Sequence, residues 1–172
     1  LPPPFDGVSL FSGGLDSLIG AIDTLEGKGT PLLVSHAGEG LVSKSQERCF
    51  DGLKAAYPGS AFNRLRVWMS FDAGLFGDVA SEDTTRGRSF LFFSLGVTAG
   101  TSLASPFVLK VPENGLIALN VPLDRLRLGA LSTRTTHPFY IARWNDMLTA
   151  LGIGGRIDNP YWDKTKGEMV AG

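Results

Sequence analysis

The sequence has little cysteine, little histidine and no excess of either charge. Among its 172 residues, one is cysteine and two are histidine, so the chain can form neither an intramolecular disulfide nor a cysteine-based zinc site. The single thiol, Cys49, suits a reducing compartment, and we expect a cytoplasmic protein. The 16 Lys and Arg residues nearly balance the 17 Asp and Glu residues. This balance gives no support to a broad nucleic-acid-binding or membrane-binding surface, but it is compatible with a local basic cleft.

Two common phosphate-binding motifs are also missing, because no GxxxxGK[ST] occurs and no GxGxxG follows an expected strand. The stretch from Ser89 to Leu109 has no charged residue and is long enough to raise a membrane-spanning alternative. Its serines, threonines, glycines and Pro106 favour a buried helix followed by a buried strand instead. We therefore expect no membrane partner.

The composition, 43% hydrophobic and 19% charged, predicts one globular domain over residues 1–172. Because the chain begins with Leu1 and three prolines, we expect a segment of a longer protein. Short apolar runs alternate with helix-like stretches, which predicts an α/β fold with a mostly parallel sheet of about five strands and helices on both faces. The expected strands include 8–11, 32–34, 64–69 and 107–111, and the expected helices are 15–25, 42–57, 89–103 and 138–151.

The segment Ser12-Gly13-Gly14-Leu15-Asp16-Ser17 lies between the first strand and the first helix. In such a unit the loop amides and the first-turn amides point at one spot, and the helix dipole adds about half a positive charge there. The loop is therefore expected to bind an anion beyond the carboxyl ends of the strands. In the alternative interpretation, Asp16 or Ser17 only caps the helix and the glycines only form a turn.

This segment matches the SGGxDS signature of the PP-loop ATP pyrophosphatases. The chain resembles their QueC-like branch, which makes 7-cyano-7-deazaguanine, and within it most closely the QatC-like components of anti-phage systems. The resemblance implies an adenine nucleotide alpha hydrolase-like fold that binds ATP and Mg²⁺ and cleaves ATP between the α and β phosphates. It also implies an adenylated intermediate. Zinc is not expected within this segment, because the closely spaced ligands of a structural zinc site are absent.

The resemblance also assigns roles to segments that follow the other strands. Arg86-Gly87-Arg88 resembles the segment that opens a buried helix near the α phosphate. In the alternative interpretation, the two arginines are solvated residues at the start of a helix and bind no ligand. Lys166 matches a lysine that could stabilise the leaving pyrophosphate. The stretch from Ser132 to His137 places several hydrogen-bonding groups just before Pro138, which predicts a second polar pocket.

The expected ATP-binding residues are Ser12, Gly13, Gly14, Leu15, Asp16, Ser17, Ser35, His36 and Gly87, with Asp16 also a ligand of Mg²⁺. The expected catalytic residues are Arg88, Arg134 and Lys166, and the expected substrate-binding residues are Glu113, Thr133, Thr135, Thr136 and His137.

The function that this resemblance implies is adenylation of an acid, followed by transfer of the activated group to a nitrogen nucleophile. The partner is a small-molecule acid or a protein acceptor, and a homodimer or a complex with other defence proteins fits the same resemblance. Two alternatives stay open: a PP-loop enzyme that modifies RNA, and a nucleotide-binding scaffold without turnover. We expect valine at Gly13 or Gly14 to weaken ATP binding while the fold survives.

Overall fold

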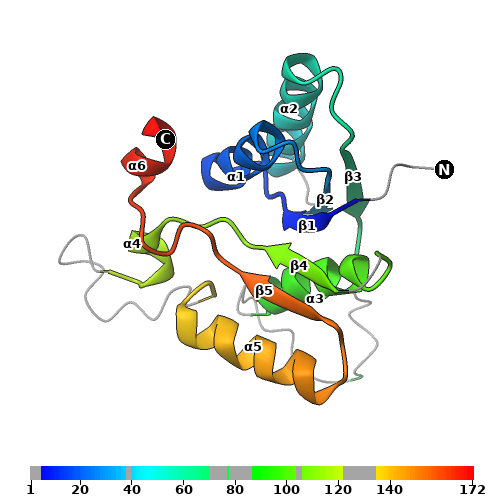
Figure 1. Cartoon of the computed structure of the whole chain (residues 1–172), viewed down its shortest axis with the longest axis vertical. Coiled ribbons are helices and arrows are strands. Elements are labelled where there is room, and N and C mark those ends of the chain that lie inside the picture. The colour runs from blue at the N-terminus through cyan, green and yellow to red at the C-terminus, as the bar shows by residue number, and fades with distance from the viewer. Residues whose placement is uncertain (1–4, 38–39, 70–76, 78–86, 104–105, 122–134) are drawn as a thin grey trace.

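The chain folds around a five-stranded parallel sheet (Figure 1). The computed structural model describes residues 5–37, 40–69, 77, 87–103, 106–121 and 135–172. In the described residues the strands lie in the order β3-β2-β1-β4-β5, and every neighbouring pair is parallel. The expected α/β fold is thereby confirmed. The strands are β1 (Gly7–Leu10), β2 (Pro31–His36), β3 (Asn63–Val67), β4 (Phe107–Lys110) and β5 (Gly155–Asp158).

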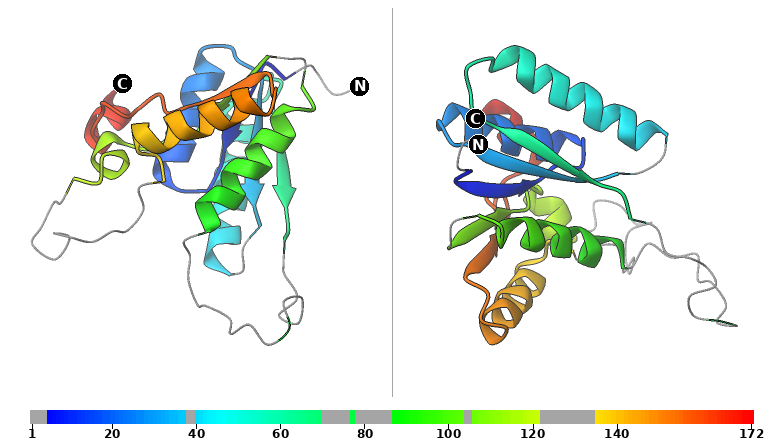
Figure 2. Two further views of the ribbon diagram at one scale, coloured as in Figure 1. Left: turned by 90° about the horizontal axis from the view of Figure 1, so that it is seen from below. Right: turned by 90° about the vertical axis from the view of Figure 1, so that its right-hand side faces the viewer.

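Helices cover both faces of the sheet, as the right-hand view of Figure 2 shows. Helices α1 (Leu15–Glu26) and α2 (Leu41–Ala56) pack on one face, where Phe11 and Leu33 are fully buried. Helices α3 (Arg88–Gly100) and α5 (Pro138–Ala150) pack on the opposite face. Alternate residues of each strand point to opposite faces, so a buried parallel sheet needs two apolar cores.

Two short helices follow β4 and β5 at the carboxyl edge of the sheet (Figure 1). Helix α4 (Gly115–Ala118) is capped by the Asn114 side chain, which accepts a hydrogen bond from the Ile117 amide. Helix α6 (Lys166–Ala171) begins with a capping box formed by Thr165 and Glu168. These caps fix the start of each helix.

The observed elements differ from the expected ones mainly at their ends. The third strand ends at Val67 rather than residue 69, because its partner β2 ends at His36, the residue that pairs with Val67. The uncharged stretch forms α3 and β4, separated by a turn. No helix in the described part of the chain has both the length and the apolarity needed to cross a bilayer.

Candidate functional site

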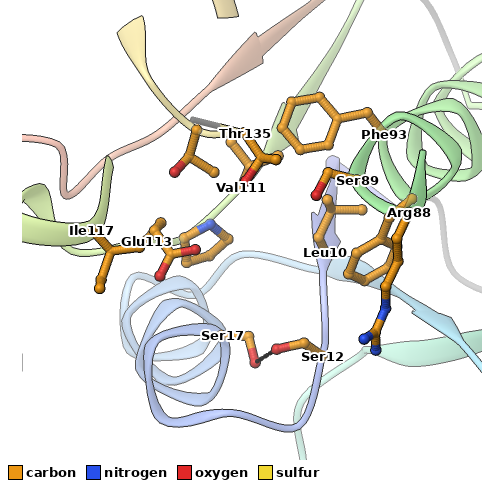
Figure 3. Close-up of a pocket in the computed structure, with 13 residues that line it drawn as sticks. Leu10, Ser12, Ser17, Arg88, Ser89, Phe93, Val111, Glu113, Ile117 and Thr135 are labelled. Atoms are coloured by element: carbon orange, nitrogen blue, oxygen red, sulfur yellow. Dashed lines mark hydrogen bonds between the residues drawn. The ribbon is translucent and has the colours of Figure 1, made fainter. Parts of the chain in front are cut away.

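The strand order places a crevice between β1 and β4. The chain after β1 continues into α1 on one face of the sheet, whereas the chain after β4 continues to α5 on the opposite face. The segments that follow β1 and β4 therefore diverge at the carboxyl ends of these two strands. Open parallel sheets bind ligands at this switch point. A cleft of about 340 Å³ lies there (Figure 3). It is lined by Leu10, Ser12, Ser17, Arg88, Ser89, Phe92, Phe93, Val111, Pro112, Glu113, Ile117, Thr135 and Thr136.

The loop after β1 is held in a fixed shape by its own hydroxyl groups and by α2. The Gly14 amide donates to Ser12 Oγ at 3.3 Å, Ser12 Oγ and Ser17 Oγ lie 3.1 Å apart, and Ser17 Oγ donates to the Gly14 carbonyl at 2.9 Å. From α2, Ser45 Oγ donates to the Gly13 carbonyl at 2.7 Å. Helix α1 has no side-chain cap at its N-terminus. Its first-turn amides are therefore not satisfied by a cap and are suited to an anion.

The two glycines of this loop serve different purposes. Gly13 has a φ of +80°, and a Cβ there would lie 2.7 Å from the Gln46 amide nitrogen of α2. The expectation that valine at Gly13 leaves the fold intact is therefore wrong, because both the backbone conformation and the packing of α2 require glycine. Gly14 has a φ of −87°, and of the residues that the structure describes a Cβ there would meet only Ser12 Oγ, at 3.4 Å.

Gly14→Val is consequently the variant that separates binding from folding. We expect it to weaken ATP binding at least tenfold, because the branched side chain would crowd the amides at the start of α1. Isothermal titration calorimetry measures the affinity, and circular dichroism checks that the variant is folded. Gly52→Val on α2, where a Cβ meets none of the described residues within 4 Å, is the matched control and should bind ATP normally. Unchanged affinity in a folded Gly14→Val protein would place the anion elsewhere.

A second helix N-terminus faces the same cleft. Helix α3 starts after Gly87 and carries no acidic residue in its first turn, and no side chain of the described residues caps it. Its first two residues, Arg88 and Ser89, line the cleft (Figure 3). A guanidinium at a helix N-terminus is unfavourable without an anion, because the helix dipole is positive at that end. The cleft therefore combines two helix N-termini, three serine hydroxyls and one arginine, all of which favour a negatively charged ligand.

Asp16 lies in the first turn of α1 and joins three segments of the chain. Its Oδ2 accepts hydrogen bonds from the Asn114 amide at 3.0 Å and from Asn114 Nδ2 at 2.7 Å, and its Oδ1 lies 3.2 Å from Lys166 Nζ. Burial raises the pKa of Asp16, but the bonds from Asn114 and the charge of Lys166 outweigh it and hold that pKa below its usual value. Asp16 is therefore ionised and links α1 to the residue after β4 and to the start of α6. Lys166 forms an ion pair with Asp16 and does not line the cleft.

Glu113 follows β4 and lies at the cleft wall. Burial, the nearby Asp16 charge and a hydrogen bond with the Asp16 side chain raise its pKa to about 7, and the charge of Lys166 opposes this only in part. Its backbone is fixed by Asn159, whose Nδ2 donates to the Glu113 carbonyl at 2.8 Å. Among the described residues, no group of three or more His, Cys, Asp or Glu side chains could hold a metal ion.

The raised pKa of Glu113 predicts a specific pH dependence of stability. Between about pH 4.5 and 7 the carboxyl is protonated in the folded protein and ionised in the unfolded chain, so rising pH destabilises the fold. Glu113→Gln should remove this loss and raise the free energy of unfolding by about 3 kcal/mol at pH 8, with no gain at pH 4. Urea titrations in EDTA at both pH values measure the difference. Asp51→Asn, at an exposed carboxyl, should change neither value, and an equal effect of Glu113→Gln at both pH values would contradict the assignment.

Several other expected site residues have structural tasks. Ser35 is fully buried and donates to the Phe11 carbonyl at 2.7 Å, which ties β2 to the end of β1. His137 caps α5, because its Nδ1 accepts from the Phe139 amide at 3.1 Å. Leu15 is exposed and is the first residue of α1. Among the described residues, a Cβ at Gly87 meets nothing within 4 Å, so their packing does not require glycine there.

The remaining expectations divide between the cleft and segments beyond the described residues. Thr135 and Thr136 line the cleft, and His36 lines a small cavity beside it. Thr133 and Arg134, like Arg86, lie outside the described residues, so their expected roles stay predictions.

The sequence interpretation missed two residues that shape the site. Asn114 was not among the expected site residues, although it binds Asp16. Gln46 contacts both the loop and His36. The helical spacing of the sequence could have predicted that Gln46 is buried, because it follows Val42 by four residues and lies in line with Phe50 and Leu53 on the buried stripe of α2.

Comparison of the sequence with protein-family models and with curated proteins finds no match. The interpretation of the cleft therefore depends on its own geometry and on the sequence motif that forms it.

Proposed function

We propose that this chain is an ATP-binding domain that transfers the adenylyl group of ATP to an acid substrate and releases pyrophosphate. The observation that supports this most directly is the convergence of two uncapped helix N-termini and Arg88 on one cleft. Positive potential and amide donors from separate elements suit a polyphosphate better than a single carboxylate. The likeness of the loop at residues 12–17 to the PP-loop signature supports the choice of ATP.

In the proposed reaction, an oxygen of the acid attacks the α phosphorus, the bond from that phosphorus to the bridging oxygen breaks, and pyrophosphate leaves. The loop amides with Ser12 and Ser17 bind the β and γ phosphates, and Arg88 neutralises charge that develops on the α phosphoryl group. A nitrogen nucleophile then attacks the activated carbon, releases AMP and loses a proton to solvent.

Magnesium is the cofactor that this reaction requires, and Glu113 is the residue best placed for it. Asp16 fits less well than expected, because Asn114 donates two hydrogen bonds to its Oδ2 and the ammonium of Lys166 lies 3.2 Å from its Oδ1. Glu113 lies in a cleft suited to anions, where its ionised carboxylate would repel phosphate unless a cation lay between them. Mg²⁺ commonly binds one or two carboxylates together with substrate phosphates, and here it would add positive charge against the phosphate oxygens.

Two measurements test the proposal on the whole chain. Calorimetric titration with ATP and MgCl₂ should give saturable binding, and titration with tripolyphosphate should compete with it. Pyrophosphate release should then depend on one of a panel of carboxylic acids, with and without an amine. ATP binding without release for any acid would favour the scaffold, release that depends on RNA would favour the RNA-modifying enzyme, and no binding of ATP or tripolyphosphate would refute the proposal.

A further inference from the structure

A second cavity lies on the α1 face of the sheet, apart from the anion cleft. Phe107, Leu109 and Ile157 belong to the core with α3 and α5, so the alternate residues of β4 and β5 point to the opposite face. These alternate residues line a cavity of about 410 Å³, and they are Val108, Lys110, Arg156 and Asp158. Among the described residues, none lines both this cavity and the cleft.

The β1 wall of this cavity carries a buried hydroxyl group that lacks a partner. Ser9 is 1% exposed and lines the cavity, and its Oγ has no hydrogen bond within the described part of the chain. Its side chain points to the α1 face, because Val8 and Leu10 on either side belong to the core with α3 and α5. Buried hydroxyl groups in folded proteins are nearly always hydrogen-bonded. The Ser9 hydroxyl therefore indicates a ligand that supplies the missing bond.

The ammonium group of Lys110 belongs to the same wall. Ser9 and Lys110 are paired in the register of β1 and β4. Lys110 is partly buried and its Nζ donates to Thr24 Oγ1 at 3.1 Å, but no carboxylate of the described residues lies within 4 Å of that nitrogen. An ammonium group has three donors, so two remain for a ligand. Lys110 and Ser9 together form a subsite for an acceptor group with negative charge.

Carboxylates lie on the other walls of the cavity. Asp23 of α1 accepts a hydrogen bond from Tyr161 at its Oδ2, whereas its Oδ1 has no partner among the residues that the structure describes. Asp158 of β5 lies 3.8 Å from an exposed guanidinium, that of Arg156. In all, three aspartates and two basic residues of the described chain line the cavity. Its walls therefore repel a dianion and match a molecule that carries one charge of each sign.

We propose that this cavity is a second binding site, for a free amino acid. The carboxylate of the amino acid accepts hydrogen bonds from Lys110 Nζ and Ser9 Oγ, and its ammonium group lies toward Asp23 and Asp158. Lys110 does not pair with these carboxylates directly, and a small molecule with both charged groups satisfies both sides at once. The site uses neither ATP nor the cleft, so this inference is independent of the proposed function.

The test screens the common amino acids against the unaltered chain by NMR, which detects weak binding and identifies the residues involved. At least one amino acid should cause saturable shifts at the amides of Ser9 and Lys110, and not at those of Ser12 and Ser89 in the cleft. Its N-acetyl derivative and its carboxamide each lack one of the two charges. Each derivative should bind at least about tenfold more weakly than the amino acid itself.

Lys110→Met and Asp23→Asn each remove one charge from the walls, and each should weaken binding of the same amino acid at least about tenfold. The amide in Asp23→Asn keeps an oxygen that can accept from Tyr161. Lys44→Met and Asp51→Asn, at exposed positions of α2, are the matched controls and should bind the amino acid normally. The NMR spectrum of each variant shows whether it is folded.

Ser9→Ala separates binding from folding, because it removes a hydroxyl that has no partner in the unliganded chain. It should weaken binding about threefold without lowering the stability of the unliganded chain. Failure of every amino acid to bind would overturn the inference. Equal binding of the N-acetyl derivative would overturn it too and would assign the cavity to an anion alone. Shifts confined to the cleft, or full affinity in folded Lys110→Met and Asp23→Asn, would likewise refute the site.

Discussion

Arg88→Ala is expected to slow ATP-dependent pyrophosphate release about 100-fold while changing the dissociation constant of ATP less than threefold. Arg88 is the first residue of α3 and lines the cleft beside the loop after β1. In the proposed reaction, charge grows on the α phosphoryl group as the bond to pyrophosphate breaks, so the guanidinium interacts more strongly with the transition state than with bound ATP. A 100-fold effect corresponds to about 2.7 kcal/mol. Calorimetry gives the affinity, and a pyrophosphate assay at saturating ATP gives the rate.

Arg48→Ala is the matched control, because Arg48 is exposed on α2 and lines a different cavity. It should leave both quantities unchanged. Equal losses of affinity and rate in Arg88→Ala would show that Arg88 binds the ground state. Normal turnover in Arg88→Ala would remove it from the reaction and direct attention to Arg134, the other arginine expected from the sequence.

The parts of this site that the sequence predicted correctly are local. The alternation of apolar runs with helical spacing predicted the α/β fold, since the pattern of each strand or helix is visible within a few neighbouring residues. The glycine loop was recognisable for the same reason: Gly13 and Gly14 follow a strand and precede a helix. The position of the cleft then followed from the rule that parallel strands present their carboxyl ends on one edge.

The parts that could not be predicted depend on pairings over long distances in the chain. The hydrogen bonds from Asn114 to Asp16 join residues 98 positions apart, and no pattern within a segment encodes that contact. Residue type near the end of a strand or the start of a helix also leaves the direction of the side chain open. Ser35 and His137 were both expected to bind ligand, yet the first bonds to a carbonyl of the neighbouring segment and the second caps its own helix.

Asp16→Ala is expected to have the largest effect on stability. The change leaves two buried donors of Asn114 without an acceptor and Lys166 without its partner. Hydrogen bonds to a charged group contribute about 1.5–3 kcal/mol each, and the pair with Lys166 contributes little because that side chain is 54% exposed. We therefore expect the free energy of unfolding to fall by about 3 kcal/mol, which lowers the melting temperature by roughly 6–12 °C.

Urea titration of Asp16→Ala, Lys166→Met and the double variant separates the two contributions. Lys166→Met alone should cost less than about 1 kcal/mol, and Asp51→Ala, at an exposed carboxylate on α2, should cost less still. A loss in Lys166→Met as large as that in Asp16→Ala would mean that the ion pair, and not Asn114, holds the carboxylate.

The pH dependence of the same variant identifies the ionised state of Asp16. Because its pKa is lowered in the folded protein, the stability it contributes is present above the ordinary pKa of an aspartate and is lost as the pH falls through the folded value. The difference between the unaltered chain and Asp16→Ala should be greatest near neutral pH and shrink only in acid, below about pH 4. Removing Asp16 also takes a like charge from Glu113, so the loss of stability between about pH 4.5 and 7 should become smaller in this variant. A profile for Asp16→Ala parallel to that of the unaltered chain from neutral pH down to pH 3 would show that the fold does not lower the pKa of Asp16, and that Asn114 and Lys166 do not stabilise its ionised form.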